Sequence, residues 1–200
     1  HRSGYYRDQT FMLALNEISV QQIFSALYAN TDLKKEPMSG GRQMGSHFMS
    51  NYIDEKGDFI DSTQKYNSSA DISPTSGQMP RLLGLAMASK LYRDGSFNSK
   101  NFSNNGNEVA WGTIGNASTS EGPFFEVFNA AGVHQVPMII SVWDDEYGIS
   151  VNNSYQTTKS SISKALHGFK RDKSNKGFEI YTVDGWDYQS LIQIYEHSSN

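Results

Sequence analysis

The feature that most constrains the fold is a pair of apolar runs on either side of one helical segment. Val109–Ile114 and Val136–Trp143 have the pattern of short buried strands, and Ser120–Val133 has that of an amphipathic helix. Strand, helix and strand in this order form a βαβ unit, and strands that are apolar along their whole length are typical of a parallel sheet. We therefore predict an α/β fold, a parallel sheet with helices on both faces.

The rest of the chain is expected to add helices, loops and one more strand to this unit. In chain order the expected elements are one or two helices in Phe11–Tyr28, a long ordered loop at 30–71, a buried helix at Gln78–Tyr92, a surface loop at 93–107, a mobile hydroxyl-rich segment at 151–177, a third strand in Phe178–Gly185, and a helix at Tyr188–Tyr195. Asp187 is expected to cap that last helix. We treat residues 1–200 as a single domain.

Composition narrows the range of partners. The chain has 200 residues, of which 37% are hydrophobic, enough to bury the core of one domain. Its net charge of -4 argues against nucleic acid as a partner, because phosphate binding needs a basic face. No apolar run reaches the ~20 residues of a membrane span, so we expect a cytoplasmic protein without membrane contact. The absence of cysteine excludes disulfides and thiolate chemistry.

A polar cluster follows each of the two predicted strands. The turn at Gly115, Asn116 and Ala117 follows the first strand, and the pair Asp144-Asp145 follows the second. In open parallel sheets ligands bind beyond the carboxyl ends of the strands, so we expect both clusters to face one site. The spacing from Ser118 to Glu121 fits a capping box, which would place free helix amides beside the turn, where an anion binds.

The same clusters carry the oxygen atoms that a hard cation prefers. Asn116 and Asp145 offer an amide oxygen and a carboxylate, a suitable half-shell for Mg²⁺ shared with phosphate oxygens. Anion and cation groups together favour a metal-bound diphosphate. An ordinary βα turn with a capped helix and a solvated acidic pair fits the local pattern better, so the pattern alone does not establish a ligand site.

A wider set of motifs resembles the alpha subunit of the 2-oxoacid dehydrogenase decarboxylating component. Its thiamin-diphosphate signature has the form GDGATSEG followed later by NNxYAIS, and Thr119–Gly122 and Tyr147–Ser150 are similar to its two parts. Four more segments resemble family motifs in the expected order: GYYRD at 4–8, GRQMGSHF at 41–48, SPTSGQMP at 73–80 and VDGWD at 183–187. The GRQM form points to the branched-chain 2-oxoacid subgroup.

This resemblance implies a thiamin-diphosphate-binding fold with thiamin diphosphate and Mg²⁺ as cofactors. The cofactor-binding residues that it implies are Tyr6, Arg7, Ser73, Thr75, Gly115, Asn116, Ala117, Ser118, Asp145, Tyr147 and Ile149. Among them, Asn116, Asp145 and the carbonyl of Tyr147 would bind the metal. Tyr6 and Arg7 would contact the diphosphate, where a guanidinium forms paired, charge-assisted hydrogen bonds. We assign no catalytic residue, and His47, His167 and Arg42 receive no role.

Two positions depart from the family pattern in a compensating way. The family has an acid in the first turn and Asn at the later ligand position, whereas this chain has Asn116 and Asp145. One carboxylate and one amide remain, so the charge of the site is conserved. A unit charge about 4 Å from a phosphate is worth ~4 kcal/mol at an effective dielectric of ~20, so we expect a functional metal site. Gly77 replaces a Thr of a monovalent-ion loop, and no such ion is assigned.

The resemblance implies oxidative decarboxylation of a 2-oxoacid with acyl transfer to a lipoyl carrier. The implied partners are a beta subunit or fused beta half and a lipoyl-bearing acyltransferase of a multienzyme complex, and we expect an oligomer. The chain is expected to be a fragment, truncated at both ends. The alternatives are a non-catalytic assembly relative of the same fold and a pyruvate- or acetoin-type alpha subunit. A nucleotide-binding protein is disfavoured because neither a Walker lysine pattern nor GxGxxG occurs.

Overall fold

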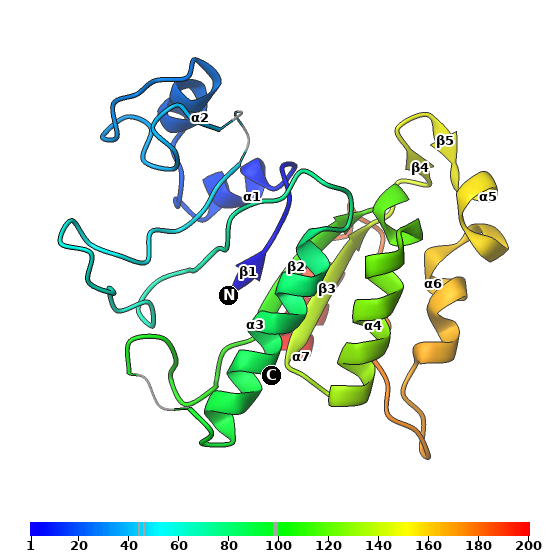
Figure 1. Ribbon diagram of the computed structural model, residues 1–200. Helices are drawn as coiled ribbons and strands as arrows, with labels where there is room; N and C mark the ends of the chain where they lie inside the picture. The colour runs from blue at the N-terminus through cyan, green and yellow to red at the C-terminus, as the bar shows by residue number, and fades with distance from the viewer. Residues whose placement is uncertain (44, 46, 98–99) are drawn as a thin grey trace.

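A three-stranded parallel sheet lies at the centre of the computed structural model, which describes residues 1–43, 45, 47–97 and 100–200 (Figure 1). The motif at 41–48 and the loop at 93–107 therefore each contain two positions outside the described residues. The sheet has the order β1-β2-β3, with β1 at Arg2–Ser3, β2 at Ala110–Gly115 and β3 at Met138–Trp143. Both pairings are parallel, so the predicted parallel sheet is confirmed.

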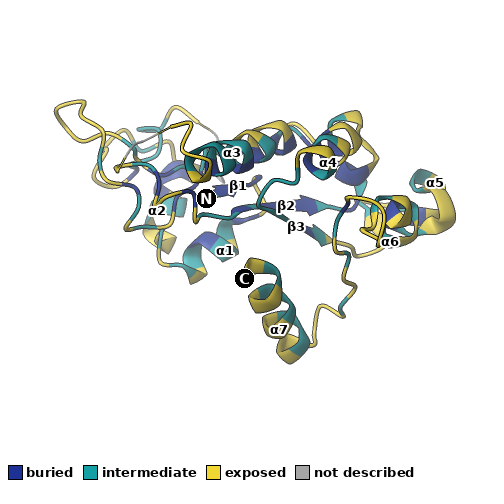
Figure 2. Ribbon diagram, turned by 90° about the horizontal axis from the view of Figure 1, so that it is seen from below, coloured by how far each residue is buried: buried dark blue, intermediate teal, exposed yellow. Residues whose placement is uncertain are grey.

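Helices cover both faces of this sheet, as predicted. Figure 2 shows α3 (Gln78–Arg93) and α4 (Gly122–His134) on one face, and α1 (Gln9–Ala14) and α7 (Tyr188–Ser199) on the other. The predicted βαβ unit is confirmed, because β2 and β3 pair along their full lengths and α4 connects them. As predicted, the side chain of Asp187 caps α7 by accepting the backbone N–H of Ser190.

The main core fills the space between the sheet and the α3–α4 layer. Leu82 of α3, Ile114 of β2 and Phe124 of α4 have no exposed surface and belong to one hydrophobic cluster. Burial of a side chain of this size stabilises a fold by about 1.5–3 kcal/mol. The core therefore fixes the ends of β2 and α4, between which the candidate site lies.

The remaining elements are short and lie outside the central sheet. They are α2 (Val20–Leu27), β4 (Tyr147–Gly148), β5 (Val151–Asn152), α5 (Asn153–Gln156), α6 (Ile162–Ala165) and three 3-10 helices at Ala117–Ser120, Thr158–Ser160 and Leu166–Phe169. The described part of 30–71 contains only isolated bridges, in agreement with the predicted loop. Among the helices of the described residues, none combines the length and apolar character that a membrane crossing needs.

Two of the sequence predictions are wrong, one strand and one helix cap. Phe178–Gly185 is not a strand, because it makes a single bridge, from Phe178 to Lys170, and has no ladder along a neighbouring strand. The predicted capping box at Ser118 is absent, because the residues after β2 form a 3-10 turn and the helix begins only at Gly122. Pro123 explains this start, since its missing N–H and fixed φ suit the first turn of a helix.

The hydroxyl-rich segment is more structured than the sequence suggested. It contains β5, α5, α6 and two 3-10 turns, whereas only a mobile segment was expected. Ile162 and Leu166 are buried and belong to the main core cluster. These two apolar anchors hold the segment against the molecule.

Candidate functional site

The two polar clusters meet at the carboxyl ends of β2 and β3. Gly115 and Trp143 are the last paired residues of the two strands, and Asn116 and Asp144 follow them. The side-chain amide of Asn116 donates a hydrogen bond to Oδ1 of Asp144. Asn116 is only 3% exposed and Asp144 is exposed, so this contact is partly buried at the edge of the fold. The predicted meeting of the clusters is thus present, and the acidic residue in contact is Asp144.

The two acids of the pair have different surroundings. Oδ1 of Asp144 also accepts the backbone N–H of Glu146 at 3.0 Å, which orients that carboxylate inside the turn. Asp145 is exposed, and its Oδ1 accepts the backbone N–H of Tyr147 at 3.1 Å. In the described part of the chain, no hydrogen bond reaches Oδ2 of Asp145. That oxygen is therefore available to a ligand.

Gln156 is a member of the site that the sequence analysis missed. Its side-chain amide donates to Oδ1 of Asn116 at 2.9 Å, and its backbone carbonyl accepts a hydrogen bond from the hydroxyl of Ser120 at 3.0 Å. A Cβ added to Gly148 would lie 2.6 Å from Cβ of Ala117, so the hairpin β4–β5 packs directly on the 3-10 turn. No motif covers Gln156, and its only signal is the polar helical turn in which it lies.

The N-terminal motif reaches the same end of the sheet through Tyr5. The buried ring of Tyr5 lies 6.4 Å from the ring of Trp143, and a Cβ added to Gly115 would lie 3.4 Å from its hydroxyl. Burial raises the pKa of Tyr5 to about 12. Asp8 adds to this rise, Arg7 opposes it, and Asp145 adds a smaller part. Arg7 and Asp145 are thus both close enough to influence one side chain at the strand ends.

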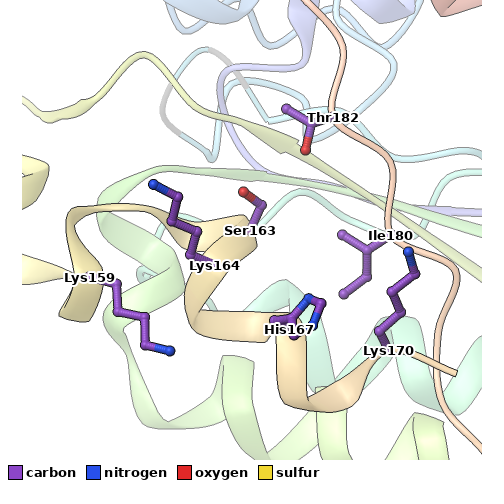
Figure 3. A pocket seen from close by; sticks show the side chains of 7 residues that line it. All are labelled: Lys159, Ser163, Lys164, His167, Lys170, Ile180 and Thr182. Atoms are coloured by element: carbon purple, nitrogen blue, oxygen red, sulfur yellow. The ribbon is translucent and has the colours of Figure 1, made fainter. Parts of the chain in front are cut away.

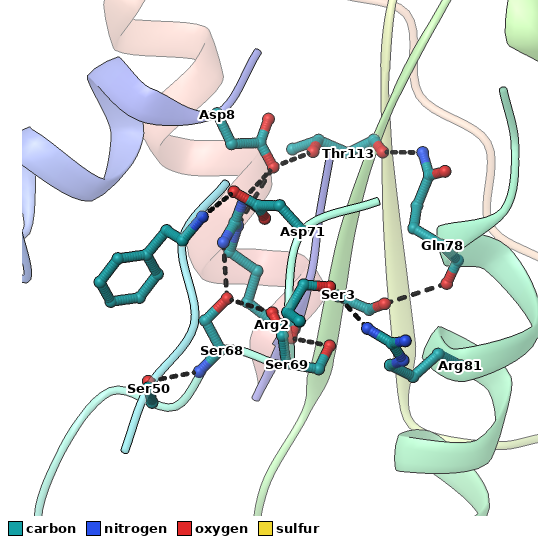
Figure 4. Close-up of polar contacts among 12 residues, drawn as sticks. Arg2, Ser3, Asp8, Ser50, Ser68, Ser69, Asp71, Gln78, Arg81 and Thr113 are labelled. Atoms are coloured by element: carbon teal, nitrogen blue, oxygen red, sulfur yellow. Dashed lines mark hydrogen bonds and ion pairs between the residues drawn. The ribbon is translucent and has the colours of Figure 1, made fainter. Parts of the chain in front are cut away.

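A buried ion cluster fixes the chain around this motif (Figure 4). The guanidinium of Arg2 donates to Asp8 at 2.7 Å and to Asp71 at 2.6 Å, and Thr113 of β2 donates to Asp8. The side chains of Arg2, Asp8 and Asp71 are 6%, 0% and 1% exposed. The cluster joins β1, the turn before α1, the long loop and β2. Burial raises the pKa of Asp71 to about 6, and the charge of Arg2 partly opposes that rise.

The segment with Ser73 and Thr75 approaches the N-terminal motif from the other side. Ile72 forms a parallel bridge with Tyr5, which places the following residues next to that motif. The hydroxyl of Ser73 pairs with Nε2 of His47 at 2.5 Å. Ser73 and Thr75 are exposed, and among the described residues no hydrogen bond joins them to the cluster around Asn116.

The predicted residues of the hairpin face solvent. Ile149 is 95% exposed and Tyr147 48%. Ile149 has a φ of 59°, a left-handed conformation that costs a β-branched residue on the order of 1–3 kcal/mol. Ser118 is buried in the 3-10 turn beneath the hairpin. The hairpin therefore holds a strained apolar side chain at the open end of the site.

The donor chemistry of the predicted ligands fits Mg²⁺. The Asn116 amide oxygen, the Asp145 carboxylate and the Tyr147 carbonyl are hard oxygen donors, the type that this cation prefers. Within the described residues no three His, Cys, Asp or Glu side chains are grouped as a metal site, so such a site depends on the amide and carbonyl oxygens. Oxygen donors of this type would suit a cation at the strand ends.

Comparison with known proteins places the chain in a family. Residues 2–193 match the family model of the dehydrogenase E1 component. The chain is 28% identical over 198 residues to 2-oxoisovalerate dehydrogenase subunit alpha of Bacillus subtilis (strain 168), an alignment that covers 97% of this chain and 49% of that protein. The chain thus spans about half the length of this relative. The resemblance seen in the motifs is confirmed, and the chain belongs to the dehydrogenase E1 component family.

Proposed function

We propose that this chain forms the diphosphate and magnesium half of a thiamin-diphosphate site in an enzyme that oxidatively decarboxylates a 2-oxoacid. The observation that carries the proposal is the convergence of three segments at the strand ends: the N-terminal motif through Tyr5, the turn at Asn116, and the acidic pair at Asp144. A site beyond the carboxyl ends of parallel strands is where this fold class binds its ligands. The family membership adds independent support.

In this proposal the chain's own residues bind and orient the cofactor. Arg7, held over the ring of Tyr6 at 5.4 Å from its centroid, would bind the diphosphate through paired charge-assisted hydrogen bonds. Gly115, Ala117 and Ser118 would line the diphosphate. Backbone groups near Ser73 and Thr75 would face the cofactor rings, with Ile149 close to them. The side chain of Ile149 is 95% exposed, and contact with the cofactor rings would cover it.

Asn116, Asp145 and the carbonyl of Tyr147 would bind Mg²⁺, and Asp144 would act on the metal site indirectly. Asp144 holds the amide nitrogen of Asn116, which leaves the amide oxygen of that residue to accept Gln156 and to face a cation. The decarboxylation chemistry would come from the thiazolium ring of the bound cofactor. The chain would position the cofactor, balance its charge and fix the direction from which the ring is approached.

The substrate proposed is a branched-chain 2-oxoacid, with the acyl group passed to a lipoyl-bearing acyltransferase. The GRQM form of the motif at 41–48 and the name of the Bacillus subtilis relative both support this class. A beta subunit or fused beta half would complete the site. The exposed side chains of Tyr147 and Ile149 in the hairpin would lie at the boundary between this chain and the beta half.

Isothermal calorimetry tests the proposal directly. Thiamin diphosphate is titrated into the 200-residue chain with Mg²⁺ and then with EDTA, in each case with and without the beta half. Binding that requires Mg²⁺ supports the proposal. Asn116→Ala and Asp145→Ala should each weaken binding at least tenfold, since each removes an oxygen ligand. Asp94→Ala removes a carboxylate at the far end of α3 and should leave affinity unchanged.

The same titrations separate the alternatives. Absence of binding even with the beta half present would favour a non-catalytic assembly relative. Unchanged affinity in Asn116→Ala and Asp145→Ala would end the metal assignment. Asp144→Asn separates indirect from direct metal binding: a loss smaller than that of Asp145→Ala is expected, and a larger loss would make Asp144 the ligand.

A further inference from the structure

A cavity lies beside α6, apart from the residues of the proposed cofactor site. Its volume is about 390 Å³, within the range of sites for small organic ligands. It is lined by Lys159, Ser163, Lys164, His167, Lys170, Ile180 and Thr182 (Figure 3). None of these residues belongs to the set implied by the family motifs.

Two segments that are far apart in the sequence build the walls of this cavity, and the core holds both of them. One wall is the run from Lys159 to Lys170, anchored by the buried Ile162 and Leu166. The other wall follows Phe178, whose ring stacks on that of Phe128 at 4.1 Å. Backbone hydrogen bonds tie the two walls together, from Phe178 to Phe169 at 2.9 Å and from Arg171 to Phe178 at 2.8 Å. The lining residues are therefore carried on a fixed framework.

The cavity concentrates positive charge in an acidic chain. Three lysines and one histidine line it and no carboxylate does, although the chain has a net charge of -4. Across the described residues the ion pairs within 4.0 Å both involve Arg2, so an acidic side chain does not neutralise these lysines at that distance. Lys159 and Ser160 have φ of 60° and 49°, left-handed conformations that are costly outside glycine. Lys159, which lines the cavity, is thus strained, and backbone strain clusters at ligand clamps.

The shape and the remaining lining residues indicate the class of anion. The hydroxyls of Ser163 and Thr182 add neutral donors to the ammonium groups, a combination suited to several oxygens of one phosphate. Inorganic phosphate has five heavy atoms, so it is only a few times larger than a water molecule, which takes ~30 Å³ in the liquid, and it would leave most of about 390 Å³ unfilled. Ile180 offers an apolar surface on the wall beside Lys170 (Figure 3). We propose that this cavity binds a small phosphate monoester, the phosphate among the lysines and the carbon body against Ile180.

Nuclear magnetic resonance of the full 200-residue chain tests this proposal, with phenyl phosphate as the probe. Titration should shift the imidazole signals of His167 and the amide signal of Thr182 in a saturable way. Inorganic phosphate should bind more weakly, and phenol should cause no shift at these positions. The double variant Lys164→Gln/Lys170→Gln should bind phenyl phosphate at least tenfold more weakly. The matched control Lys35→Gln/Lys56→Gln removes the same charge from exposed positions elsewhere and should change affinity less than twofold.

Three results would overturn the proposal. Equal weakening in both double variants would show general attraction to positive charge and no site. Shifts at Asn116 with none at His167, abolished by Arg7→Gln, would place the probe at the proposed cofactor site. Equal affinity for inorganic phosphate and phenyl phosphate would remove the assignment of a carbon body against Ile180. Thiamin diphosphate binding with Mg²⁺ is measured separately, so the two proposals can fail independently.

Discussion

Arg2 is the residue on which the buried charge balance near the N-terminus depends. Its guanidinium faces the carboxylates of Asp8 and Asp71, and all three side chains are almost fully buried. Arg2→Met keeps the apolar stem but leaves two buried acids without a cation. Loss of one partner from a buried ion pair costs about 3–5 kcal/mol, and we expect that loss in urea unfolding at pH 7. Lys56→Met, at an exposed position, should cost less than about 0.5 kcal/mol. Equal losses would contradict this role for Arg2.

Asp71 should make stability fall as the pH rises through weakly acidic values. Burial raises its pKa in the folded chain from 3.8 to about 6, so the folded state binds a proton more tightly than the unfolded state. Its contribution is fully present below pH 3.8 and is lost as the pH rises through about 6, a change on the order of 3 kcal/mol. Urea unfolding between pH 4 and pH 7 measures it. Asp71→Asn should flatten this part of the profile, and an unchanged slope would refute the assignment.

At the residue scale, motif resemblance found some site residues and could not find others. Asn116 and Asp145 stand in the signature, so the sequence gives their positions directly. Asp144 contacts Asn116 because β2 and β3 end side by side. Gln156 contacts Asn116 only because α5 folds back onto the 3-10 turn. A contact that depends on a chain reversal leaves no periodic signal in the sequence. The same reason hides the pairing of Arg2 with a loop residue distant in the chain.

At the scale of elements, the approach of α3 to the sheet depends on the absence of a side chain in β2. A Cβ added to Gly112 would lie 2.4 Å from Cδ2 of Leu82, a fully buried residue of α3. Gly112→Ala should therefore destabilise the fold by about 1–3 kcal/mol through overpacking. Gly84 lies in α3, and a Cβ added there would have no atom within 4 Å. Gly84→Ala should therefore stabilise the fold by about 0.5–1 kcal/mol. Thermal unfolding of both variants tests the pair, and shifts of equal sign would contradict it.

The elements that the sequence predicted are those with a strong local pattern. The βαβ unit was predictable because its apolar runs and amphipathic helix are long enough to show their periods. Two-residue β1 is too short for any period, and it joins the sheet through pairing with Trp111 and Gly112. Phe178–Gly185 has the composition of a strand, but apolar side chains do not supply the backbone partner that a strand needs. Tertiary pairing decided both cases.

At the scale of the whole molecule, the proposed cofactor site is assembled from four segments that are distant in the chain. The N-terminal motif, the turn after β2, the acidic pair after β3 and α5 meet at one end of the sheet. Each segment is held by contacts to a neighbour, and the buried cluster of Arg2 fixes the first of them. A ligand that contacts all four segments would therefore stabilise them together.

This arrangement predicts how hydrogen exchange will respond to the cofactor. With Mg²⁺ and thiamin diphosphate at about one hundred times the dissociation constant, the folded state should gain about 2.7 kcal/mol by mass action. Amides of residues 4–8, 115–118, 144–149 and 153–156 should then all exchange more slowly, whereas those of the exposed turn at 172–176 should not change. EDTA should reverse the protection in all four segments together. Protection confined to one of them would mean that the diphosphate is held locally and that the four segments do not form a common site.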